Sequence, residues 1–265
     1  QVTSVAQNDN ISSRLAQTKG INVVSPTWFY IADGSGSITS LASSAYVEYV
    51  HGLGMEVWGL VDNFTTPDLP MSEILGSAST RAHMIDQLIQ YATEYSLDGI
   101  NVDFEELGED TGESFVQFIR ELALRCHENN LVLSVDNHVP YQFNSFYNME
   151  EQSAFADYII MMSYDEHLNE STGAGSVASI EYVTTAIERT LQQGVPAEKL
   201  INAVPFYTRI WSETPMSAEE AAAAASGGER ESYTLGWETL GMASAAEQVA
   251  QHGASPVWDD TLKQN

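Results

Sequence analysis

Residues 98–105 read Asp-Gly-Ile-Asn-Val-Asp-Phe-Glu, and this stretch decides the predicted fold. It follows a helical pattern and is itself predicted as a strand, in which successive side chains point to opposite faces. Three apolar residues share one face and three polar residues share the other: Ile100, Val102 and Phe104 against Asn101, Asp103 and Glu105. The apolar face indicates a strand packed under helices, so we expect the polar face to point into a closed parallel sheet rather than into solvent, which would require an edge strand.

Five further β-rich runs accompany this stretch, at residues 21–29, 55–61, 131–136, 158–164 and 200–207. Between most of these runs lie helical patterns, over residues 80–95, 112–129 and 179–193. Strands that alternate with helices, without hairpin turn signals, predict crossover connections and a parallel sheet, hence the α/β class. An open doubly wound sheet usually carries a glycine-rich phosphate loop after an early strand, and this chain has none, so we predict a (β/α)8 TIM barrel.

The predicted barrel is two strands short. No β-like run precedes Ile21 or follows Tyr207 that could serve as the first or the eighth strand, so we expect an incomplete barrel, with those strands before Gln1 and after Asn265. Residues 1–211 are the predicted catalytic core, and whether this piece alone is active stays open.

Residues 212–265 differ in composition and are predicted to be an insertion subdomain that follows the seventh strand. Helices are expected over residues 216–225 and 243–252. The first of these is rich in alanine, and because alanine has the highest helix propensity we favour a surface helix over a low-complexity linker.

The composition excludes several classes of partner. The chain has 37 acidic and 10 basic residues and a formal charge of −27. Binding to nucleic acid or to an anionic membrane draws on clustered Lys and Arg, so we expect neither partner. No apolar stretch approaches the roughly 20 residues of a membrane helix. The single cysteine, Cys126, falls among apolar residues at helical spacing and is predicted to be a packed thiol rather than a reactive one.

Other hydrolase chemistries find no support in the sequence. His83, His127 and His138 lie on different predicted elements without the spacing of metal ligands, and the chain has no Gly-x-Ser-x-Gly motif. We therefore predict neither a metal nor a cofactor. Two buried carboxylates about 7 Å apart along one strand instead indicate a site where burial splits pKa values.

Three motifs carry a resemblance to a known family. Residues 98–105 resemble the Asp-Gly-x-Asp-x-Asp-x-Glu signature of glycoside hydrolase family 18, the chitinases and endo-β-N-acetylglucosaminidases, with Asn101 in place of the middle acid. Residues 161–165, Met-Met-Ser-Tyr-Asp, resemble the Met-x-Tyr-Asp motif of the family. Residues 203–209, Ala-Val-Pro-Phe-Tyr-Thr-Arg, resemble its Pro-Phe-Tyr-x-Arg motif.

With residues 25–29 and 134–138, the chain most resembles the bacterial branch that includes spore cortex-lytic N-acetylglucosaminidases. The resemblance covers nearly the whole chain. It implies a retaining hydrolase of β-1,4-linked N-acetylglucosamine polymers, with peptidoglycan ahead of chitin as the polysaccharide partner. It also implies a bacterial, extracellular location at the cell wall or spore.

The resemblance assigns three catalytic residues. Glu105 would be the general acid that protonates the glycosidic oxygen and then the base that activates water. The 2-acetamido oxygen of the substrate would itself attack the anomeric carbon, as in the substrate-assisted exceptions to the two-carboxylate scheme. Asp103 would orient that acetamido group, and Tyr164 would donate a hydrogen bond to its oxygen; the alternative for Tyr164 is a core aromatic whose hydroxyl is satisfied.

Five further residues are predicted to contact the sugar: Asn101, Asp136, Met162, Asp165 and Tyr207. Asp136 has a structural hydrogen-bond role as an equal alternative, and Arg209 is expected to pair either with a pocket acid or with the insertion. The competing function is a catalytically silent sugar-binding protein on the same barrel. Lectin-like relatives of that kind typically lose the final Glu of the signature, whereas Glu105 is present.

Overall fold

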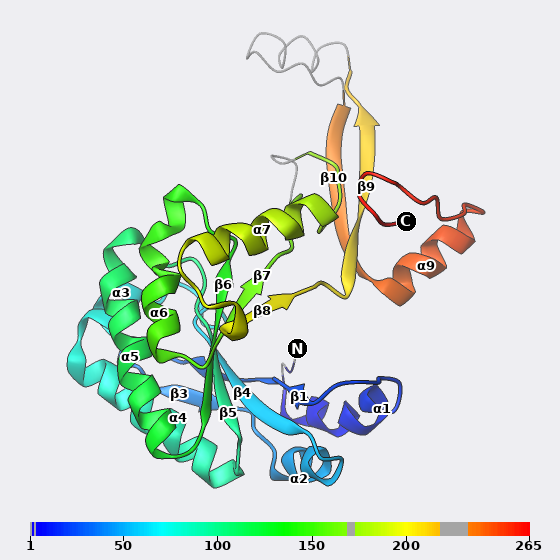
Figure 1. The fold of residues 1–265 in the computed structure, drawn as a ribbon. Helices are drawn as coiled ribbons and strands as arrows, with labels where there is room; N and C mark the ends of the chain where they lie inside the picture. The colour runs from blue at the N-terminus through cyan, green and yellow to red at the C-terminus, as the bar shows by residue number, and fades with distance from the viewer. Residues whose placement is uncertain (1, 3, 169–172, 218–232) are drawn as a thin grey trace. The chain divides into compact units, whose positions relative to one another are not determined.

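The computed structural model describes residues 2, 4–168, 173–217 and 233–265 (Figure 1). The chain forms two compact units. The first comprises Gln1–Met161 and Arg189–Ile201, and the second comprises Met162–Glu188 and Asn202–Asn265. The predicted division into residues 1–211 and 212–265 was based on the expected barrel strands, whereas these two units are defined by compactness. The predicted division therefore stays a prediction.

The first unit is built on one sheet with the strand order β3-β2-β4-β5-β6-β7-β8, and β1 pairs with β4 beside this path. The strands are β1 (Val23–Val24), β2 (Thr27–Ile31), β3 (Ile38–Ser40), β4 (Glu56–Asp62), β5 (Gly99–Asp103), β6 (Val132–His138), β7 (Tyr158–Met162) and β8 (Leu200–Ala203). The pairs β1–β4, β2–β4, β4–β5 and β5–β6 are parallel, and β3 runs antiparallel to β2. The predicted α/β class with a parallel sheet is therefore confirmed.

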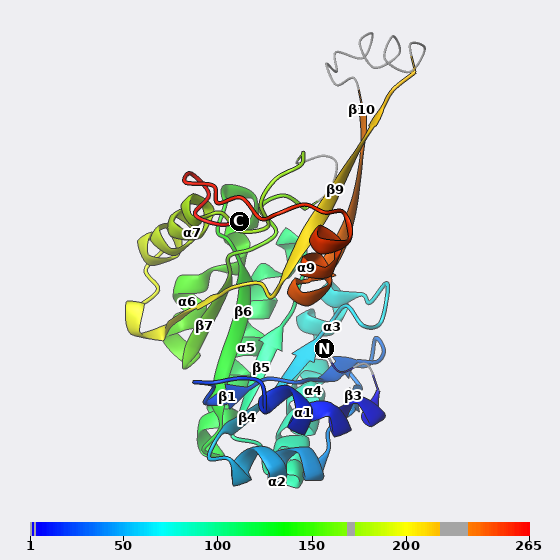
Figure 2. The same cartoon turned by 90° about the vertical axis from the view of Figure 1, so that its right-hand side faces the viewer.

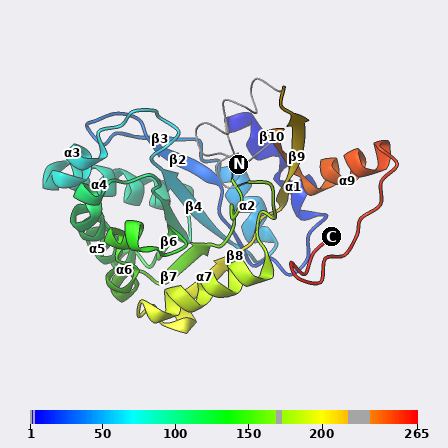
Figure 3. The ribbon, with the colours of Figure 1, turned by 90° about the horizontal axis from the view of Figure 1, so that it is seen from above.

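Helices of the first unit cover the sheet. Figures 1 and 3 show α3 (Met71–Gly76), α4 (Ala78–Tyr95), α5 (Gly112–Glu128) and α6 (Met149–Phe155) on one side of the strands, and Figure 2 shows α4 and α5 behind β4, β5 and β6. One face of α4 is buried through Met84, Ile85, Leu88 and Ala92, and α5 likewise buries its apolar residues, among which Cys126 is fully buried. Burial raises the pKa of the Cys126 thiol to about 12, which confirms a packed thiol.

The remaining elements of this unit are short. They are η1 (Val5–Asn10), α1 (Ile11–Leu15), α2 (Ser44–Gly52), η2 (Glu109–Thr111), η3 (Gln142–Tyr147) and η5 (Ala197–Lys199). Several boundaries differ from the prediction. The run 21–29 is divided into β1 and β2 at Ser25 and Pro26, β5 ends at Asp103, and β7 ends at Met162. Helix α4 begins two residues before its predicted start, because Ser77 accepts the capping hydrogen bond from the Thr80 amide.

The second unit contains a two-stranded antiparallel ribbon that the sequence analysis missed. It consists of β9 (Tyr207–Pro215) and β10 (Tyr233–Gly241), with Trp211 opposite Trp237, followed by α9 (Met242–Gln251). The predicted strand 200–207 was wrong at its end, since Tyr207 begins the ribbon. The predicted helix 243–252 is present as α9, whereas most of the alanine-rich run 216–225 lies outside the described residues. Helix α7 (Ile180–Gln192) begins in this unit and ends in the first.

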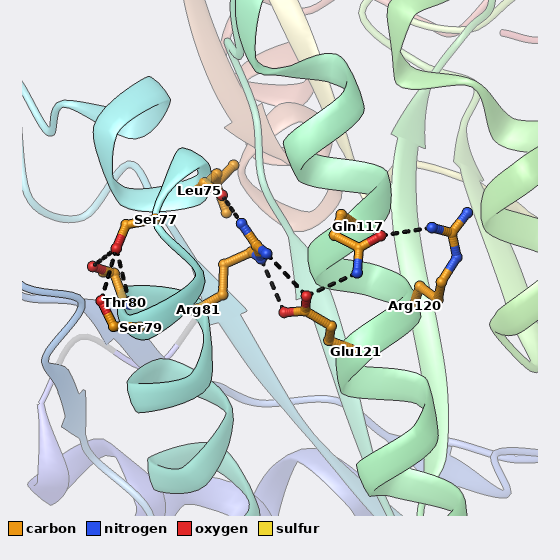
Figure 4. A network of polar contacts seen from close by, with 8 residues as sticks. All are labelled: Leu75, Ser77, Ser79, Thr80, Arg81, Gln117, Arg120 and Glu121. Carbon is orange, nitrogen blue, oxygen red and sulfur yellow. Dashed lines mark hydrogen bonds and ion pairs between the residues drawn. The ribbon is translucent and has the colours of Figure 1, made fainter.

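A buried guanidinium joins the helical layer of the first unit (Figure 4). Arg81 on α4 donates two hydrogen bonds of 2.9 Å to the Glu121 carboxylate on α5 and one of 2.6 Å to the Leu75 carbonyl at the end of α3. The Gln117 amide donates to the same carboxylate at 2.8 Å and accepts from Arg120 at 2.6 Å. Hydrogen bonds from Arg81 hold the pKa of Glu121 below its ordinary value. Three helices are thus fixed behind the strands that carry the acids.

Arg81→Ala is expected to lower the free energy of unfolding by about 2–3 kcal/mol, because it leaves a part-buried carboxylate and a buried carbonyl without their donor. Urea denaturation measures this change. Arg125→Ala is the matched control: Arg125 pairs with Asp86 at 2.7 Å, but both side chains are exposed, so we expect a loss below about 1 kcal/mol. Equal losses for the two variants would contradict the role of the buried pair.

Candidate active site

Acidic side chains gather where three neighbouring strands of the first unit end. Asp62 is the last residue of β4 and stands opposite Asp103, the last residue of β5. On β6, Ser134 stands opposite Asn101, and Asp136 follows two residues later on the same face. Parallel strands bring their carboxyl ends to one edge, which is where α/β enzymes hold their ligands and catalytic groups. The predicted polar face of residues 98–105 therefore meets two further acids.

Asn101 is the link between β5 and β6. Its side chain is buried, its amide nitrogen donates to Asp136 Oδ2 at 2.9 Å, and its amide oxygen accepts from Ser134 Oγ at 2.6 Å. Both polar ends of the amide are therefore used within the protein. This arrangement gives Asp136 a structural partner and holds its carboxyl in the interior.

Asp103 and Asp136 are carboxyl groups in a setting that opposes their ionisation. Burial raises the pKa of Asp103 to about 8, and the nearby Asp136, Glu105 and Asp62 add to the shift. Burial likewise raises the pKa of Asp136 to about 7, against the opposing hydrogen bond from Asn101. One oxygen of each carboxyl, Oδ1, is buried without a hydrogen-bond partner among the described residues. Protonation removes the cost of a buried, unpaired charge.

Glu105 lies two residues beyond Asp103, and its side chain is 32% exposed. Its backbone is fixed from both sides by Asn63, whose amide oxygen accepts from the Glu105 N–H at 2.8 Å and whose amide nitrogen donates to the Glu105 carbonyl at 2.9 Å. His138 Nε2 is 3.4 Å from Glu105 Oε2. The next residue, Glu106, adopts a positive φ of 53°, so the chain turns away after Glu105. Glu105 is thus a positioned carboxyl at the surface of a buried acid cluster.

The second unit brings together two predicted site residues, Asp165 and Tyr207, with Arg209. Asp165 Oδ1 accepts from the Tyr207 hydroxyl at 2.6 Å and pairs with the Arg209 guanidinium at 2.7 Å. Burial and the carboxylate raise the pKa of Tyr207. The Arg209 side chain is only 4% exposed, and its guanidinium also donates to the His167 carbonyl at 3.1 Å. Arg209 therefore pairs with an acid, Asp165, and its guanidinium also lies 5.8 Å from the ring centroid of Trp237, in the predicted insertion.

Met162 is the last residue of β7, and Tyr164 lies two residues beyond it. The Tyr164 ring packs edge-on against Tyr207, with centroids 6.1 Å apart, and its carbonyl accepts from the Tyr182 hydroxyl at 3.4 Å. Met162 is buried, and Ser163 between them donates to Asn202 and to the Ala203 carbonyl. The contacts of these two residues with a substrate stay predictions.

Sequence reasoning missed two residues of the acid cluster. Asp62 and Asn63 follow a run that was recognised as a strand, so the rule that placed Glu105 at a strand end could also have found them. His138 was considered only as a metal ligand, and its place beside Glu105 depends on the pairing of β5 with β6. Within the described residues, no group of His, Cys, Asp and Glu could hold a metal ion. No helix in the described part of the chain has the length and apolarity to span a membrane.

Comparison with known proteins decides the family, because the sequence pattern described as "Glycosyl hydrolases family 18" matches residues 64–265. The chain belongs to glycosyl hydrolases family 18. It is 24% identical over 189 residues to the uncharacterized glycosylase YvbX of Bacillus subtilis, an alignment that covers 67% of this chain and 54% of the relative. The chain spans about half the length of the curated relatives it matches.

Solved structures of this family share the fold. A chitinase from Chromobacterium violaceum superposes with a TM-score of 0.75 at 21% identity, over 98% of this chain and 78% of that one. The spore cortex-lytic enzyme SleL of Bacillus megaterium superposes with a TM-score of 0.74 at 16% identity, over 99% of this chain and 57% of that one. The likeness to these structures establishes the mixed α/β fold.

Asp136→Asn tests the buried acids through the pH dependence of stability. Because the folded pKa values lie above the unfolded value of about 4, the folded state binds more protons between pH 4 and 8, and these groups lower the free energy of unfolding as pH rises through that window. Asn keeps an acceptor for Asn101 but cannot ionise. Relative to the wild type, the variant should gain about 2 kcal/mol on going from pH 5 to pH 8 in urea denaturation.

Glu48→Gln is the control for that measurement, since it removes one acidic group from an exposed position on α2. Its difference from the wild type should be the same at both pH values, because the substitution leaves Asp103 and Asp136 in place. A pH-independent difference for Asp136→Asn as well would mean that Asp136 is not a buried acid of raised pKa.

Proposed function

We propose that this protein is a retaining glycoside hydrolase that cleaves β-1,4-linked N-acetylglucosamine polymers, with peptidoglycan or chitin as substrate. The observation that carries the proposal is the position of Glu105, a partly exposed carboxyl fixed at the carboxyl edge of a parallel sheet in front of buried acids, in a chain of glycosyl hydrolases family 18. Glycosidases of known mechanism rely on a carboxyl group that protonates the leaving oxygen.

Glu105 is the proposed general acid and base. It transfers its proton to the glycosidic oxygen as the bond to the anomeric carbon breaks, and the 2-acetamido oxygen of the same sugar forms the new bond to that carbon. The Glu105 carboxylate then removes a proton from water, which opens the oxazolinium ion and restores the acid. Each step leaves Glu105 ready for the next turnover, and the double displacement retains the anomeric configuration.

Asp103 and Asp136 support this cycle from behind Glu105. Asp136 is buried, and the charge of Glu105 adds to the raised pKa of both carboxyls. Asp103 is the proposed partner of the acetamido group, since its Oδ1 has no hydrogen bond within the described residues and accepts a donor. Ser134 donates to Asn101, which in turn donates to Asp136. The proposed role of Asp136 is to share with Asp103 the protons that neutralise the two carboxyls.

The remaining roles rest on the family resemblance. Tyr164 is proposed to donate to the acetamido oxygen, while Met162, Asp165 and Tyr207 are proposed sugar contacts. The proposed fold is the family barrel, with 212–265 as an insertion. Because the chain resembles a spore cortex-lytic enzyme as well as chitinases, we also propose an extracellular role at a bacterial cell wall or spore.

Glu105→Gln is expected to lower the rate of hydrolysis of N-acetylglucosamine oligomers and of purified peptidoglycan by at least about 100-fold, because an amide cannot donate the proton. Glu106→Gln is the matched control: it makes the same change at the neighbouring, exposed acid and should keep wild-type rates. Equal rates for wild type and Glu105→Gln would remove Glu105 from the mechanism. Binding of the sugar without turnover by the wild type would favour the silent sugar-binding protein.

The stereochemistry of the first product tests the participation of the acetamido group. Two displacements at the anomeric carbon give a β-anomer, which proton NMR detects before mutarotation. An α-anomer as the initial product would require a single displacement by water and would exclude the proposed intermediate.

A further inference from the structure

A second hollow of the first unit lies beside the loop that follows β6. Its volume is about 400 Å³, and its lining comes from that loop and from the last turn of α7 and the residue after it: Pro140, Tyr141, Gln142, Ser145, Arg189, Gln192 and Gln193. We refer to these residues as the Arg189 hollow. One wall is aromatic, and the others present amides, a hydroxyl and a guanidinium. The hollow therefore offers apolar contact together with hydrogen bonds, the combination that a sugar ring requires.

The aromatic wall is the ring of Tyr141, which stacks on Phe143, a residue outside the lining of the hollow. The rings of Tyr141 and Phe143 are 5.5 Å apart and nearly parallel, with 9° between their planes. Phe143 is 79% exposed, and Tyr141 is 37% exposed. The Arg189 guanidinium lies over the Tyr141 ring, with Cζ 4.6 Å from its centroid. Exposed apolar surface of this kind in a polar surrounding marks a ligand-binding surface more often than a single exposed side chain does.

The loop holds the aromatic pair in a fixed conformation. The Asn144 side chain is buried, accepts from the Tyr141 N–H at 2.7 Å and donates to the Val139 carbonyl at 3.0 Å. This bracket ties both ends of the loop segment that carries Tyr141. Rigid aromatic side chains give contact area at a small cost in conformational entropy, so the pair is organised before any ligand binds.

Charge distinguishes the Arg189 hollow from the rest of the surface. The chain carries a formal charge of −27, and no carboxylate in the described part lies within ion-pair distance of Arg189. The edge of a guanidinium carries its N–H donors, which bind an acceptor. Arg binds carboxylates through two parallel hydrogen bonds, so the ligand group that fits this edge is a carboxylate.

The hollow is within reach of a glycan that occupies the acid cluster. Tyr141 follows His138 by three residues, so the chain between them spans at most about 11 Å. His138 in turn lies 3.4 Å from Glu105. A polymer bound at Glu105 therefore reaches the loop with a neighbouring sugar.

We propose that the Arg189 hollow is a substrate subsite that binds a carboxylate-bearing sugar, so that the polymer cleaved at Glu105 is an acidic, muramic-acid-containing glycan rather than neutral chitin. The sugar stacks against the Tyr141–Phe143 pair, its carboxylate pairs with Arg189, and Gln192 and Gln193 contact its amides and hydroxyls. This inference rests on the proposed hydrolase function and adds the substrate class to it.

The test compares the selectivity of two Arg189 variants. Selectivity is the ratio of kcat/KM for soluble glycan strands of peptidoglycan to kcat/KM for N-acetylglucosamine oligomers of similar length. Arg189→Gln removes the charge and should lower this ratio about tenfold through a higher KM for the acidic strand, whereas Arg189→Lys should retain part of it. Arg125→Gln, an exposed cation on α5, should leave the ratio as in the wild type.

Two outcomes would overturn the subsite: an unchanged ratio for Arg189→Gln, or the same loss for Arg125→Gln. Sedimentation with chitin and with insoluble peptidoglycan whose stem peptides have been removed, so that the carboxylate of each muramic acid is free, tests the hollow without turnover in the Glu105→Gln background. Arg189→Gln should reduce the bound fraction on peptidoglycan more than on chitin, and an equal reduction would also overturn the proposal. If the wild type hydrolyses neither polymer but Arg189→Gln still loses more binding to peptidoglycan than to chitin, the proposed hydrolase function is wrong and the proposed binding site is supported.

Discussion

The burial of two carboxyl groups, Asp103 and Asp136, is the constraint on which the rest of the site depends. Removing a charged carboxylate from water costs several kcal/mol unless hydrogen bonds or a proton compensate. Here each group keeps one oxygen without a partner among the described residues, and burial raises both pKa values. Hydrophobic burial on the opposite face of this segment offsets the cost, because Ile100, Val102 and Phe104 are all buried there. The apolar face thus fixes the strand whose polar face holds the acids.

Asn101 shapes how protons are distributed in that cluster. An amide at this position uses its nitrogen on Asp136 and its oxygen on Ser134, so it supplies no ionisable group and no hydrogen bond to Asp103. The protons that neutralise the interior must then reside on the carboxyls themselves. Asp136, on the neighbouring strand, is the second acid of the cluster, and its charge adds to the raised pKa of Asp103.

The local part of the fold followed from the sequence, and the long-range part did not. Residues 98–105 and the helices α4 and α5 were predicted because alternation and helical periodicity are properties of a few neighbouring residues. The ribbon of β9 and β10 was missed because its strands are mostly exposed and pair across a long connection without a short turn signal. The same limit applies to the site: Glu105 was found from its own strand, whereas His138 and Asp62 join it only through strand pairing.

Because acidic residues outnumber basic ones 37 to 10, the positions of the few cations determine where an anionic ligand can bind. Of the basic side chains in the described residues, five form ion pairs with carboxylates: Arg81, Arg120, Arg125, Arg209 and Lys263. Four of these pairs join one element to another, since Arg81, Arg120 and Arg125 join helices and Arg209 joins β9 to the chain after β7. In a surface of one sign, an anionic polymer is repelled except where a cation remains open. Arg189, which lies over the Tyr141 ring beside the loop after β6, is a cation of this kind. The surface charge that repels an acidic glycan elsewhere therefore favours its binding at Arg189, which directs the glycan strand toward Glu105.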